Sequence, residues 1–540
     1  MRLTLPLALL AVAALAAVVA WNPLFRATPP DYVAALAGAD TPAERGIATF
    51  AFGNWDATDD AALRTSATPW KLVNATMALQ AGSGTVPPDF DIAALYRSFG
   101  FHSPNSFANW PASAPRPMIL SPVGQSVGTG FAAFPPVGAT LSNVGCAACH
   151  SSVTYDADGA PDTGRVWLGA PNGSINLQAF TDAIFTSVRD DGQDADTVMG
   201  AVAALYPDTD WRERLTLRHF VLPELQRTVA EADAAQGALL PFRASLAGAT
   251  NGLDSLRNRL GLIRHGTALT ESIFNSVPDL GGRLWRTKLL NSGTYAIPVI
   301  DHTATITAAD ITPEHRLGLA GIIAYFTVPS MGVTEEVAKT NIATDALDIT
   351  AWMAVYTPMP FPTDIDRTLA YRGRALYDDG CASCHGTYDT VGRLTSFPNW
   401  EGDIGTDPAR AALLTPEIAD AVNGGLFGQY IDARTVDTYT APPLTGIWSS
   451  APYFHNGSVP TLWHLMRPDT RPATFQVGGH RYDLNRVGID LSPPDGYVPW
   501  SIPATVDTTA FGLSNAGHEA EFTDLTDSDR DALLEYLKTL

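Results

Sequence analysis

Every cysteine of this 540-residue chain lies in one of two Cys-x-x-Cys-His segments, at 146–150 and at 381–385. This spacing is the attachment signature of c-type haem, in which two thiols form thioethers with the porphyrin and the adjacent imidazole ligates the iron. The sequence therefore predicts two covalently bound haem c groups. The predicted attachment residues and proximal ligands are Cys146, Cys149, His150, Cys381, Cys384 and His385.

Two other uses of four cysteines are possible in an exported protein. They could form two disulfides, in three alternative pairings, or one tetrahedral zinc site. Neither use requires a histidine directly after both pairs. Because only 11 of the 540 residues are histidine, chance would place one after both pairs in roughly 4 of 10,000 sequences, which favours haem.

The N-terminus predicts the compartment. Arg2 precedes an almost purely apolar run, Leu3–Ala20, which fits a secretory signal peptide or, at about 18 residues, an uncleaved membrane anchor. Both interpretations export the body of the chain, most simply to a bacterial periplasm, where it is soluble or tethered by residues 1–20. No later stretch approaches the length and apolarity of a membrane span.

Charge narrows the expected partners. The chain has 56 acidic and 34 basic residues, a formal net charge of −22 and a pI of about 4.7. A nucleic-acid backbone would be repelled, so nucleic acid is excluded as a partner. The acidity favours solubility, with a docking face for a basic redox protein as the alternative. A small redox protein or another electron donor or acceptor is the expected partner.

The punctuation of the sequence divides the chain. The Pro-rich stretch Thr357–Pro362 is a poor helix or central strand, so residues 357–363 are predicted to be a linker. The expected organisation is a signal or anchor at 1–20, an N-terminal haem domain with a loop-rich extension at 21–356, and a C-terminal cytochrome c domain at 364–540.

Periodicity predicts a mostly α fold, with two cytochrome c-like haem domains, extensive loops and little β structure. Helical patterns occur at 174–189, 224–246, 313–326 and 367–377, and a capped amphipathic helix follows Thr526. Gly373, Tyr377 and Tyr536 predict that the helix before the second motif crosses the last helix, as in small c-type cytochromes. Residues 104–145 are predicted to wrap the first haem as loops, and no convincing run of strands and no further repeat are evident.

The run Ala441–Leu462, with Pro452-Tyr-Phe-His-Asn-Gly-Ser458 at its centre, resembles the C-terminal domain of bacterial di-haem cytochrome c peroxidases. Other features are closer to the branch of the di-haem rubber oxygenases. These are Val-Gly-Cys-Ala-Ala-Cys-His at 144–150, Pro278-Asp279 followed by Leu284-Trp285, the stretch 474–488, and Gly512–His518. The resemblance runs from about residue 140 to the end of the chain.

This resemblance implies an oxidoreductase. The C-terminal haem would transfer electrons, and the N-terminal haem would react with H₂O₂ or O₂. Because a ligand on both faces of an iron leaves only outer-sphere electron transfer, the alternative is a pure electron-transfer cytochrome with both haems six-coordinate. A haem-binding partner subunit without activity is a third possibility.

The sixth ligands separate these functions. For the C-terminal haem, the rubber-oxygenase branch implies His518 and the peroxidases imply Met466, with His455 as a further alternative or an outer residue that tunes the potential. His464 and His480 are interpreted as structural. For the N-terminal haem, Glu271, Asp301 and His302 are weak distal candidates. Trp285 is the predicted catalytic residue, because the matching Leu-Trp segment of the family lies near both haems.

Overall fold

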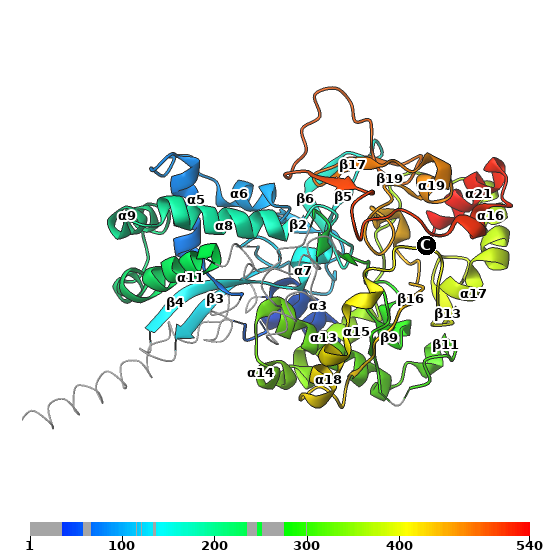
Figure 1. Ribbon diagram of the computed structural model, residues 1–540, viewed down its shortest axis with the longest axis horizontal. Helices are drawn as coiled ribbons and strands as arrows, with labels where there is room; N and C mark the ends of the chain where they lie inside the picture. Colours follow the sequence, from blue (N-terminus) through cyan, green and yellow to red (C-terminus); the bar gives the residue numbers. More distant parts are fainter. Residues whose placement is uncertain are drawn as a thin grey trace, which may run out of the picture.

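The computed structural model describes residues 35–53, 55–57, 66–114, 116–119, 121–132, 137–234, 246–250, 275–298 and 300–540. The described chain is elongated (Figure 1): one end carries a group of helices from the first half of the sequence, and the larger lobe at the other end holds the C-terminus. No helix within these ranges is long and apolar enough to cross a membrane. The predicted signal or anchor at 1–20 and Glu271 lie outside the described residues.

The mostly α prediction is wrong, because helices account for 41% of the residues and strands for 15%. The structure is mixed α/β, with many short strands in several small sheets. The larger sheets are β1 (Thr68–Pro69), β4 (Val137–Val144) and β3 (Gln125–Ala132); β2 (Ser106–Phe107), β6 (Pro161–Leu168) and β5 (Ser151–Tyr155); β15 (Asp432–Ala433), β10 (Tyr295–Ala296) and β9 (Lys288–Leu289); and β11 (Ile306–Thr307), β13 (Leu394–Phe397) and β12 (Thr387–Tyr388).

The pairs are β14 (Glu401–Gly402) with β16 (Tyr439–Thr440), β17 (Thr474–Val477) with β20 (Ala504–Asp507), β18 (Tyr482–Asp483) with β19 (Gly488–Ile489), and β7 (Ala249–Thr250) with β8 (Asn275–Ser276). Most of these strands have two residues and pair with distant parts of the chain. Such strands carry no alternating pattern of their own, which is why the sequence did not reveal them.

The β3–β4 hairpin contradicts the prediction that 104–145 form loops. Its strands pair antiparallel over eight residues, from Gln125↔Val144 to Ala132↔Val137. Gly128, Gly130 and Gly138 interrupt the alternation of apolar and polar residues, and glycine is depleted in strands. Burial of Leu141 with Leu72 of the helical end supplies the long-range packing that fixes this hairpin.

The helical end consists of α5 (Trp70–Ala81), α8 (Leu177–Asp191), α9 (Ala195–Leu205), α10 (Trp211–Thr216), the π-helix η2 (Leu217–Val221) and α11 (Leu222–Ala234). The predicted helices at 174–189 and 224–246 are confirmed as α8 and α11, although the predicted extension of α11 over 235–245 lies outside the described residues. The third predicted helix is α13 (Pro313–Met331), capped by Thr312.

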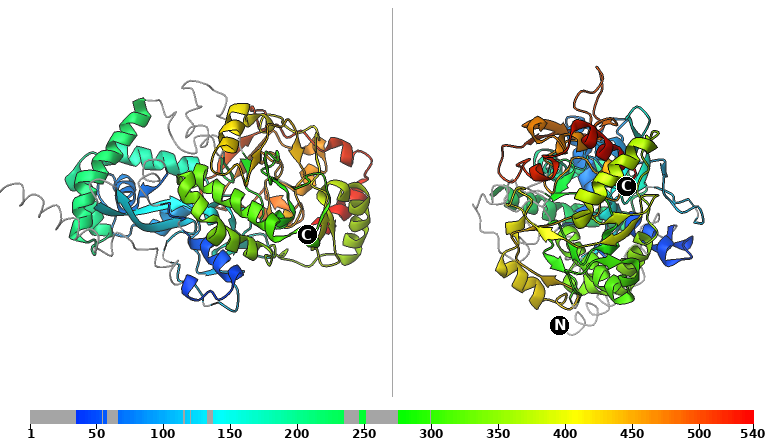
Figure 2. Two further views of the ribbon diagram at one scale, coloured as in Figure 1. Left: turned by 90° about the horizontal axis from the view of Figure 1, so that it is seen from below. Right: turned by 90° about the vertical axis from the view of Figure 1, so that its right-hand side faces the viewer.

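The predicted crossing of two helices in the C-terminal part is confirmed. Helix α16 (Arg367–Gly380) packs on α21 (Asp527–Leu537), and the rings of Tyr377 and Tyr536 lie 5.1 Å apart. Gly373 permits the crossing, because a Cβ atom there would overlap the Ala532 carbonyl oxygen. Both views of Figure 2 show α21 in red beside α16 in yellow-green, at the end of the molecule remote from α9.

The remaining elements lie between these ends and in the larger lobe. They are α3 (Pro42–Phe52), α6 (Ile92–Ser98), α14 (Glu335–Thr340), η6 (Ile342–Ala346), α15 (Leu347–Met353), α18 (Pro416–Gly424), α19 (Leu462–Leu465) and α20 (Glu519–Phe522), with 3₁₀ turns η4 (Arg283–Trp285), η5 (Ala308–Asp310), η7 (Ala411–Leu413), η8 (Ile447–Ser449) and η9 (Pro468–Thr470).

The two sides of the predicted linker 357–363 share sheets and a core. Strand β10 pairs with β15, β11 pairs with β13, and Leu319 and Tyr325 of α13 belong to one apolar cluster with Ile418 and Phe427. The domain boundary at 357–363 stays a prediction.

Candidate haem sites

The first Cys-x-x-Cys-His motif forms the one-turn helix α7 (Cys146–Cys149) between β4 and β5. Nδ1 of His150 lies 3.0 Å from the carbonyl oxygen of Pro278, to which it must donate. Nε2 therefore carries the free lone pair. Burial lowers the pKa of His150 to about 4, despite the hydrogen bond to Pro278, so the imidazole is neutral, as a metal ligand requires.

A cavity of about 320 Å³ adjoins Cys146, Cys149 and His150. Its other walls are largely apolar and come from three helices: Phe50 of α3, Leu319, Ile323 and Phe326 of α13, and Ile349 and Met353 of α15. Among the described residues that line it, His150 is the only histidine, and no aspartate or glutamate is present.

Three arginines face the same cavity: Arg283, Arg286 and Arg410. Arg286 and Arg410 are buried, and Nη1 of Arg410 is a buried donor without a hydrogen-bond partner within the described ranges. A buried, unpaired guanidinium is costly unless an anion meets it. Apolar walls, two thiols, one neutral imidazole and buried cations for propionate groups together fit a covalently attached haem.

The second motif follows α16, with Cys381 at its end and α17 (Ala382–His385) completing the turn. Nδ1 of His385 lies 2.8 Å from the carbonyl oxygen of Pro442, so this histidine is oriented in the same way as His150. None of the four cysteines forms a disulfide, and no cluster of three or more His, Cys, Asp or Glu side chains suited to a metal ion occurs in the described part of the chain.

The ring of His518 lies 6.1 Å from the ring of His385, centre to centre, with 33° between their planes. Two metal–nitrogen bonds of roughly 2 Å, each extended by about 1 Å to the ring centre, give about 6 Å between the centres of two imidazoles on one metal. The spacing therefore fits an iron between them. Burial lowers the pKa of both histidines to about 4, which keeps both rings neutral.

Arg471 holds the backbone that carries His518. Its side chain is 3% exposed and donates to the carbonyl oxygens of Asn515 (2.5 Å), Gly517 (2.9 Å) and Leu465 (2.7 Å). His518 itself has φ +61°, in the left-handed region that non-glycine residues rarely adopt. Strain of this kind persists only where neighbouring groups fix it, and it is concentrated at functional sites.

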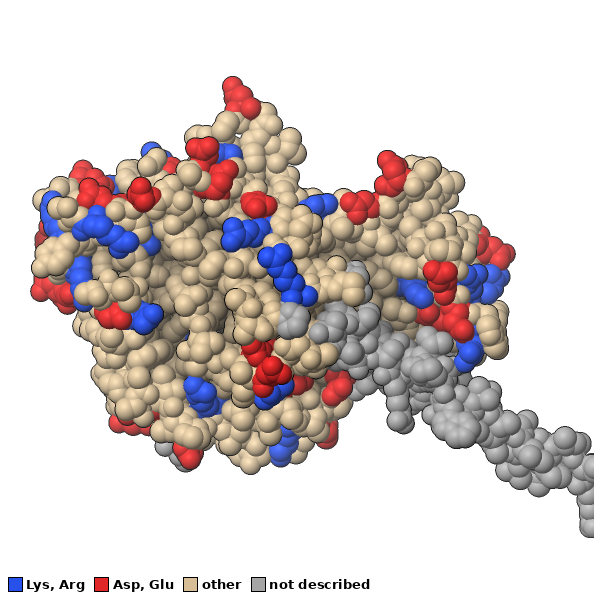
Figure 3. Space-filling model, turned by 180° about the vertical axis from the view of Figure 1, so that it is seen from behind, with Lys and Arg blue, Asp and Glu red and all other residues tan. Residues whose placement is uncertain are grey.

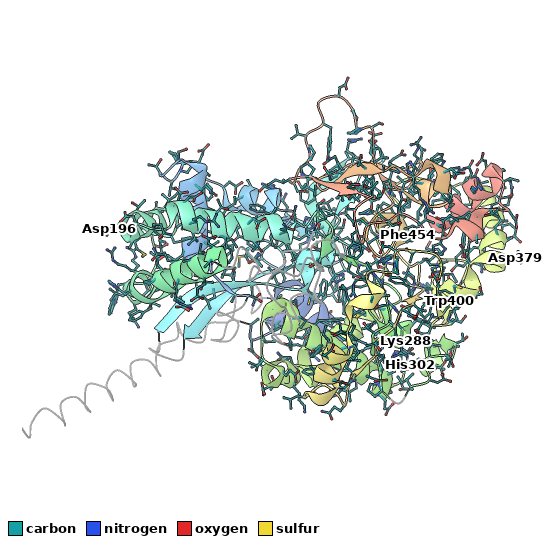
Figure 4. The ribbon with its side chains drawn as sticks, in the orientation of Figure 1. Asp196, Lys288, His302, Asp379, Trp400 and Phe454 are labelled. Carbon is teal, nitrogen blue, oxygen red and sulfur yellow. The ribbon has the colours of Figure 1, made fainter. Side chains whose placement is uncertain are left out.

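Phe454 completes the environment of His518. Its ring stacks on the imidazole at 5.9 Å, with 22° between the planes, and its opposite contact is the Arg471 guanidinium at 5.1 Å. Figure 4 marks Phe454 inside the larger lobe. Sequence reasoning missed Arg471, because an isolated arginine carries no motif.

The carbonyl oxygens that accept from His150 and His385 begin two turns of the same design. Pro278-Asp-Leu-Gly-Gly282 and Pro442-Pro-Leu-Thr-Gly446 share Pro, Leu and Gly at the first, third and fifth positions. Both glycines are left-handed, at φ +70° and +73°, and both precede a 3₁₀ turn, η4 or η8. We call residues 278–285 the first turn and 442–449 the second turn. This short repeat escaped the sequence analysis.

The other predicted residues lie elsewhere. His455 stacks on Tyr439 at 4.3 Å, and its Nε2 lies 3.2 Å from the Tyr439 hydroxyl, while its carbonyl oxygen accepts from Ser276, a residue of the cavity wall. Met466 is fully buried in an apolar cluster with Tyr377. Trp285 is half-buried in η4, between the cavity-lining residues Arg283 and Arg286.

The weaker candidates have ordinary environments. Asp301 accepts from Thr303 in an exposed turn, and His302 is half-buried beside Lys288, with which it is marked in Figure 4. His464 pairs with Thr461 at 2.7 Å, and His480 is buried beside Tyr482. Neither Asp301 nor His302 lines the cavity at His150.

Comparison with known proteins agrees with a haem c protein. A family model described as RoxA-like, cytochrome c-like matches residues 438–476, which include the second turn and Phe454. A cytochrome c-like domain implies haem c, so the chain has a cytochrome c-like relationship to the RoxA-like branch.

Two relatives come from Sinorhizobium fredii (strain NBRC 101917 / NGR234). The uncharacterized protein y4iM is 33% identical over 227 residues, which cover 34% of this chain and 51% of the relative. The uncharacterized protein y4iJ is 28% identical over 242 residues, which cover 33% of this chain and 39% of the relative. The chain thus spans about half or less of the length of these relatives.

Proposed function

We propose that the protein is an exported di-haem c-type cytochrome and an oxidoreductase. The C-terminal haem, attached at Cys381 and Cys384 and ligated by His385 and His518, transfers electrons. The N-terminal haem, attached at Cys146 and Cys149 and ligated by His150, reacts with dioxygen or peroxide. The wider relationship to di-haem peroxidases belongs to this proposal and is supported by the motif residues.

The observation that carries the proposal is the difference between the two histidines. His385 faces a second imidazole at 6.1 Å, whereas His150 faces a largely apolar cavity. An iron with imidazole on both faces resists exchange of its ligands, and an iron with an open face admits a small oxidant. The haem would supply the redox chemistry, while the chain supplies ligands, burial and hydrogen bonds.

The cavity favours dioxygen over peroxide. Heterolysis of peroxide needs a carboxylate or imidazole to move a proton between the two oxygens, and the described lining offers no such group besides His150. Tyr295, Thr327 and Ser330 supply only hydroxyls there. A largely apolar wall suits O₂ and an apolar organic substrate.

A pure electron carrier is the second candidate, and Met353 favours it. The Met353 side chain lines the cavity next to His150, and a thioether on the open face would give an iron that only exchanges electrons. Substitution of Met353 by leucine separates the two candidates.

The proposed partners are a small redox protein or another electron donor or acceptor, with no nucleic acid. Lys and Arg are interspersed with Asp and Glu on the face shown in Figure 3, without a large field of one sign, which supports solubility as the main effect of the acidity. The periplasm is the proposed location, with a tether at residues 1–20 if that segment is retained. Trp285 is proposed to lie on the electron route between the haems.

Carbon monoxide added to the reduced protein tests the proposal. We expect the spectrum of one haem to shift, and the same haem to lose its spectrum in the His150→Ala variant. Met353→Leu should leave CO binding unchanged. If neither haem binds CO in the wild type and one does in Met353→Leu, the electron-carrier function is correct. The rate of reoxidation by O₂ and by H₂O₂ then identifies the oxidant.

A further inference from the structure

The two turns behind the proximal histidines pack on one another with a local pseudo-twofold relationship. A Cβ atom on Gly282 of the first turn would lie 2.7 Å from Pro443 of the second, and one on Gly446 of the second would lie 2.5 Å from Asp279 of the first. The fifth position of each turn thus meets the second position of the other. Gly281 meets Thr445, the equivalent position of the second turn, at 2.5 Å.

The second position is where the two turns differ chemically. The second turn has Pro443, whereas the first has Asp279, which is only 3% exposed. A carboxylate is rarely buried so fully unless its oxygens are paired. Burial raises the pKa of Asp279 to about 7, against its hydrogen bonds and the nearby charge of Arg283, which lower it.

Both oxygens of Asp279 are used to hold the first turn. Oδ1 accepts from the backbone N–H of Gly281 at 2.7 Å, and Oδ2 accepts from the Tyr356 hydroxyl at 3.0 Å. Arg283, which lines the cavity, donates from Nε to the Asp279 carbonyl oxygen at 2.8 Å. The Tyr356 ring packs over Gly169, whose N–H donates to the His150 carbonyl oxygen at 2.8 Å.

We propose that Asp279 is a positioning residue that couples the two haem sites, because its carboxyl group fixes the turn behind His150 and also supports the turn behind His385. This inference rests on the proposed function, in which both histidines ligate haem. The Pro278 carbonyl that receives the Nδ1 proton of His150 is one residue from the Asp279 side chain, and the Pro442 carbonyl that receives the proton of His385 is four residues from Gly446.

The physical basis is the effect of the Nδ1 hydrogen bond on the ligand. A carbonyl that accepts from the remote nitrogen fixes the ring and raises its basicity, and loss of such a partner alters the bound metal. A shift of the Asp279 carboxyl group moves the first turn directly. Because Gly446 lies against Oδ2, the same shift also moves the second turn, so one substitution changes both potentials.

The test compares Asp279→Ala, Asp279→Asn and Tyr356→Phe in the full haem-loaded protein, by reductive titration followed by optical and EPR spectra. We expect Asp279→Ala to shift the reduction potentials of both haems. Asp279→Asn keeps an acceptor for Gly281 and should restore much of the wild-type behaviour. Tyr356→Phe keeps the ring over Gly169, removes one hydrogen bond and should give a smaller shift in the same direction.

Thr76→Val is the matched control, because it removes a buried hydrogen bond to Ser187 at the helical end. It should lower thermal stability and leave both potentials unchanged. A shift confined to the haem of His150 in Asp279→Ala, or shifts no larger than those of Thr76→Val, would overturn the coupling. If Asp279→Ala does not fold, Asp279→Asn and Tyr356→Phe still decide the question.

A double-mutant cycle tests the contact between the turns. Gly446→Ala pushes a Cβ atom against Asp279 and should shift the potential of the haem of His150, although Gly446 belongs to the other site. In the double variant with Asp279→Ala this remote effect should disappear, and additive shifts would contradict the coupling. Failure of the proposed function would be visible earlier, as a wild type lacking two haems or one with a different ligand set.

Discussion

His385 and His518 lie 133 positions apart in the sequence, and their rings are 6.1 Å apart in the structure. The side chain of each presents Nδ1 to a partner on its outer side: the Pro442 carbonyl for His385 and the Glu521 carboxylate, 3.6 Å away, for His518. Nε2 of each ring is therefore free for a metal, and a bis-histidine iron follows from orientation as well as from distance.

Removal of one ring should open the C-terminal haem. We expect His518→Ala to turn that haem from low-spin to high-spin, observed by EPR of the oxidised protein, while the haem at Cys146 keeps its spectrum. Met466→Leu is the control, since this volume-conserving change costs less than about 1.5 kcal/mol and should leave the spectrum intact. The reverse result would assign the ligand to Met466.

Arg471 should be needed for the position of His518. Arg471→Lys keeps the charge but loses the fork that reaches three carbonyl oxygens. We expect a loss of about 2 kcal/mol or more in stability and a partly high-spin C-terminal haem. The control is Arg372→Lys, because Arg372 pairs with Asp529 at the surface, where the change should stay within about 0.5 kcal/mol. Equal effects of the two variants would remove the special role of Arg471.

Covalent attachment at both motifs fixes the haem count. After acid–acetone extraction, the intact mass should exceed that of the processed polypeptide by two haems, and by one haem in a variant with Cys381 and Cys384 replaced by alanine. Haem-free protein with disulfide-bonded cysteines would contradict the cytochrome interpretation. The measurement is independent of any activity.

Local pattern was sufficient for several features. The spacing of Cys, Cys and His determines a one-turn helix with the histidine after it, and the capping box at Thr526 with the apolar period behind it determines α21. Gly373 and Tyr377 predicted the crossing with that helix, because only a residue without Cβ permits so close an approach.

Features that depend on distant partners were not readable. The β3–β4 hairpin is stabilised by burial of Leu141 against another part of the chain, not by its own alternation. The approach of His518 to His385 depends on Arg471, and the contact between the two turns depends on Gly282 and Gly446. The repeat itself has only three identical residues in five, too few to be recognised before the shared geometry was seen.

The helix crossing provides a stability test. Gly373→Ala would force a methyl group against the Ala532 carbonyl, so we expect destabilisation by about 1–3 kcal/mol and loss of the Tyr377–Tyr536 ring contact. Gly200→Ala in α9 is the control, because nothing lies within 4 Å of its Cβ position. That change should be neutral or stabilise by about 0.5–1 kcal/mol. Thermal unfolding of the two variants measures the difference.

Stability should also depend on the protonation of His102. This residue is buried, Nε2 donates to the Ser151 carbonyl oxygen at 2.9 Å, and burial lowers its pKa to about 4. The unfolded chain binds a proton at a pKa of about 6.5. The folded state binds it less readily, so this contribution is present above about pH 6.5 and is lost as the pH falls towards 4.

The variant His102→Gln separates this titration from all others. Glutamine can donate to the same carbonyl but does not titrate, so both proteins should lose stability on acidification and the wild type should lose more. At pH 5 the extra loss should be about 2 kcal/mol if the full pKa shift is expressed. Denaturant unfolding of both proteins at pH 7 and pH 5 measures it. Parallel losses would show that His102 takes up its proton without cost in the folded state, and hence that its ring is hydrated.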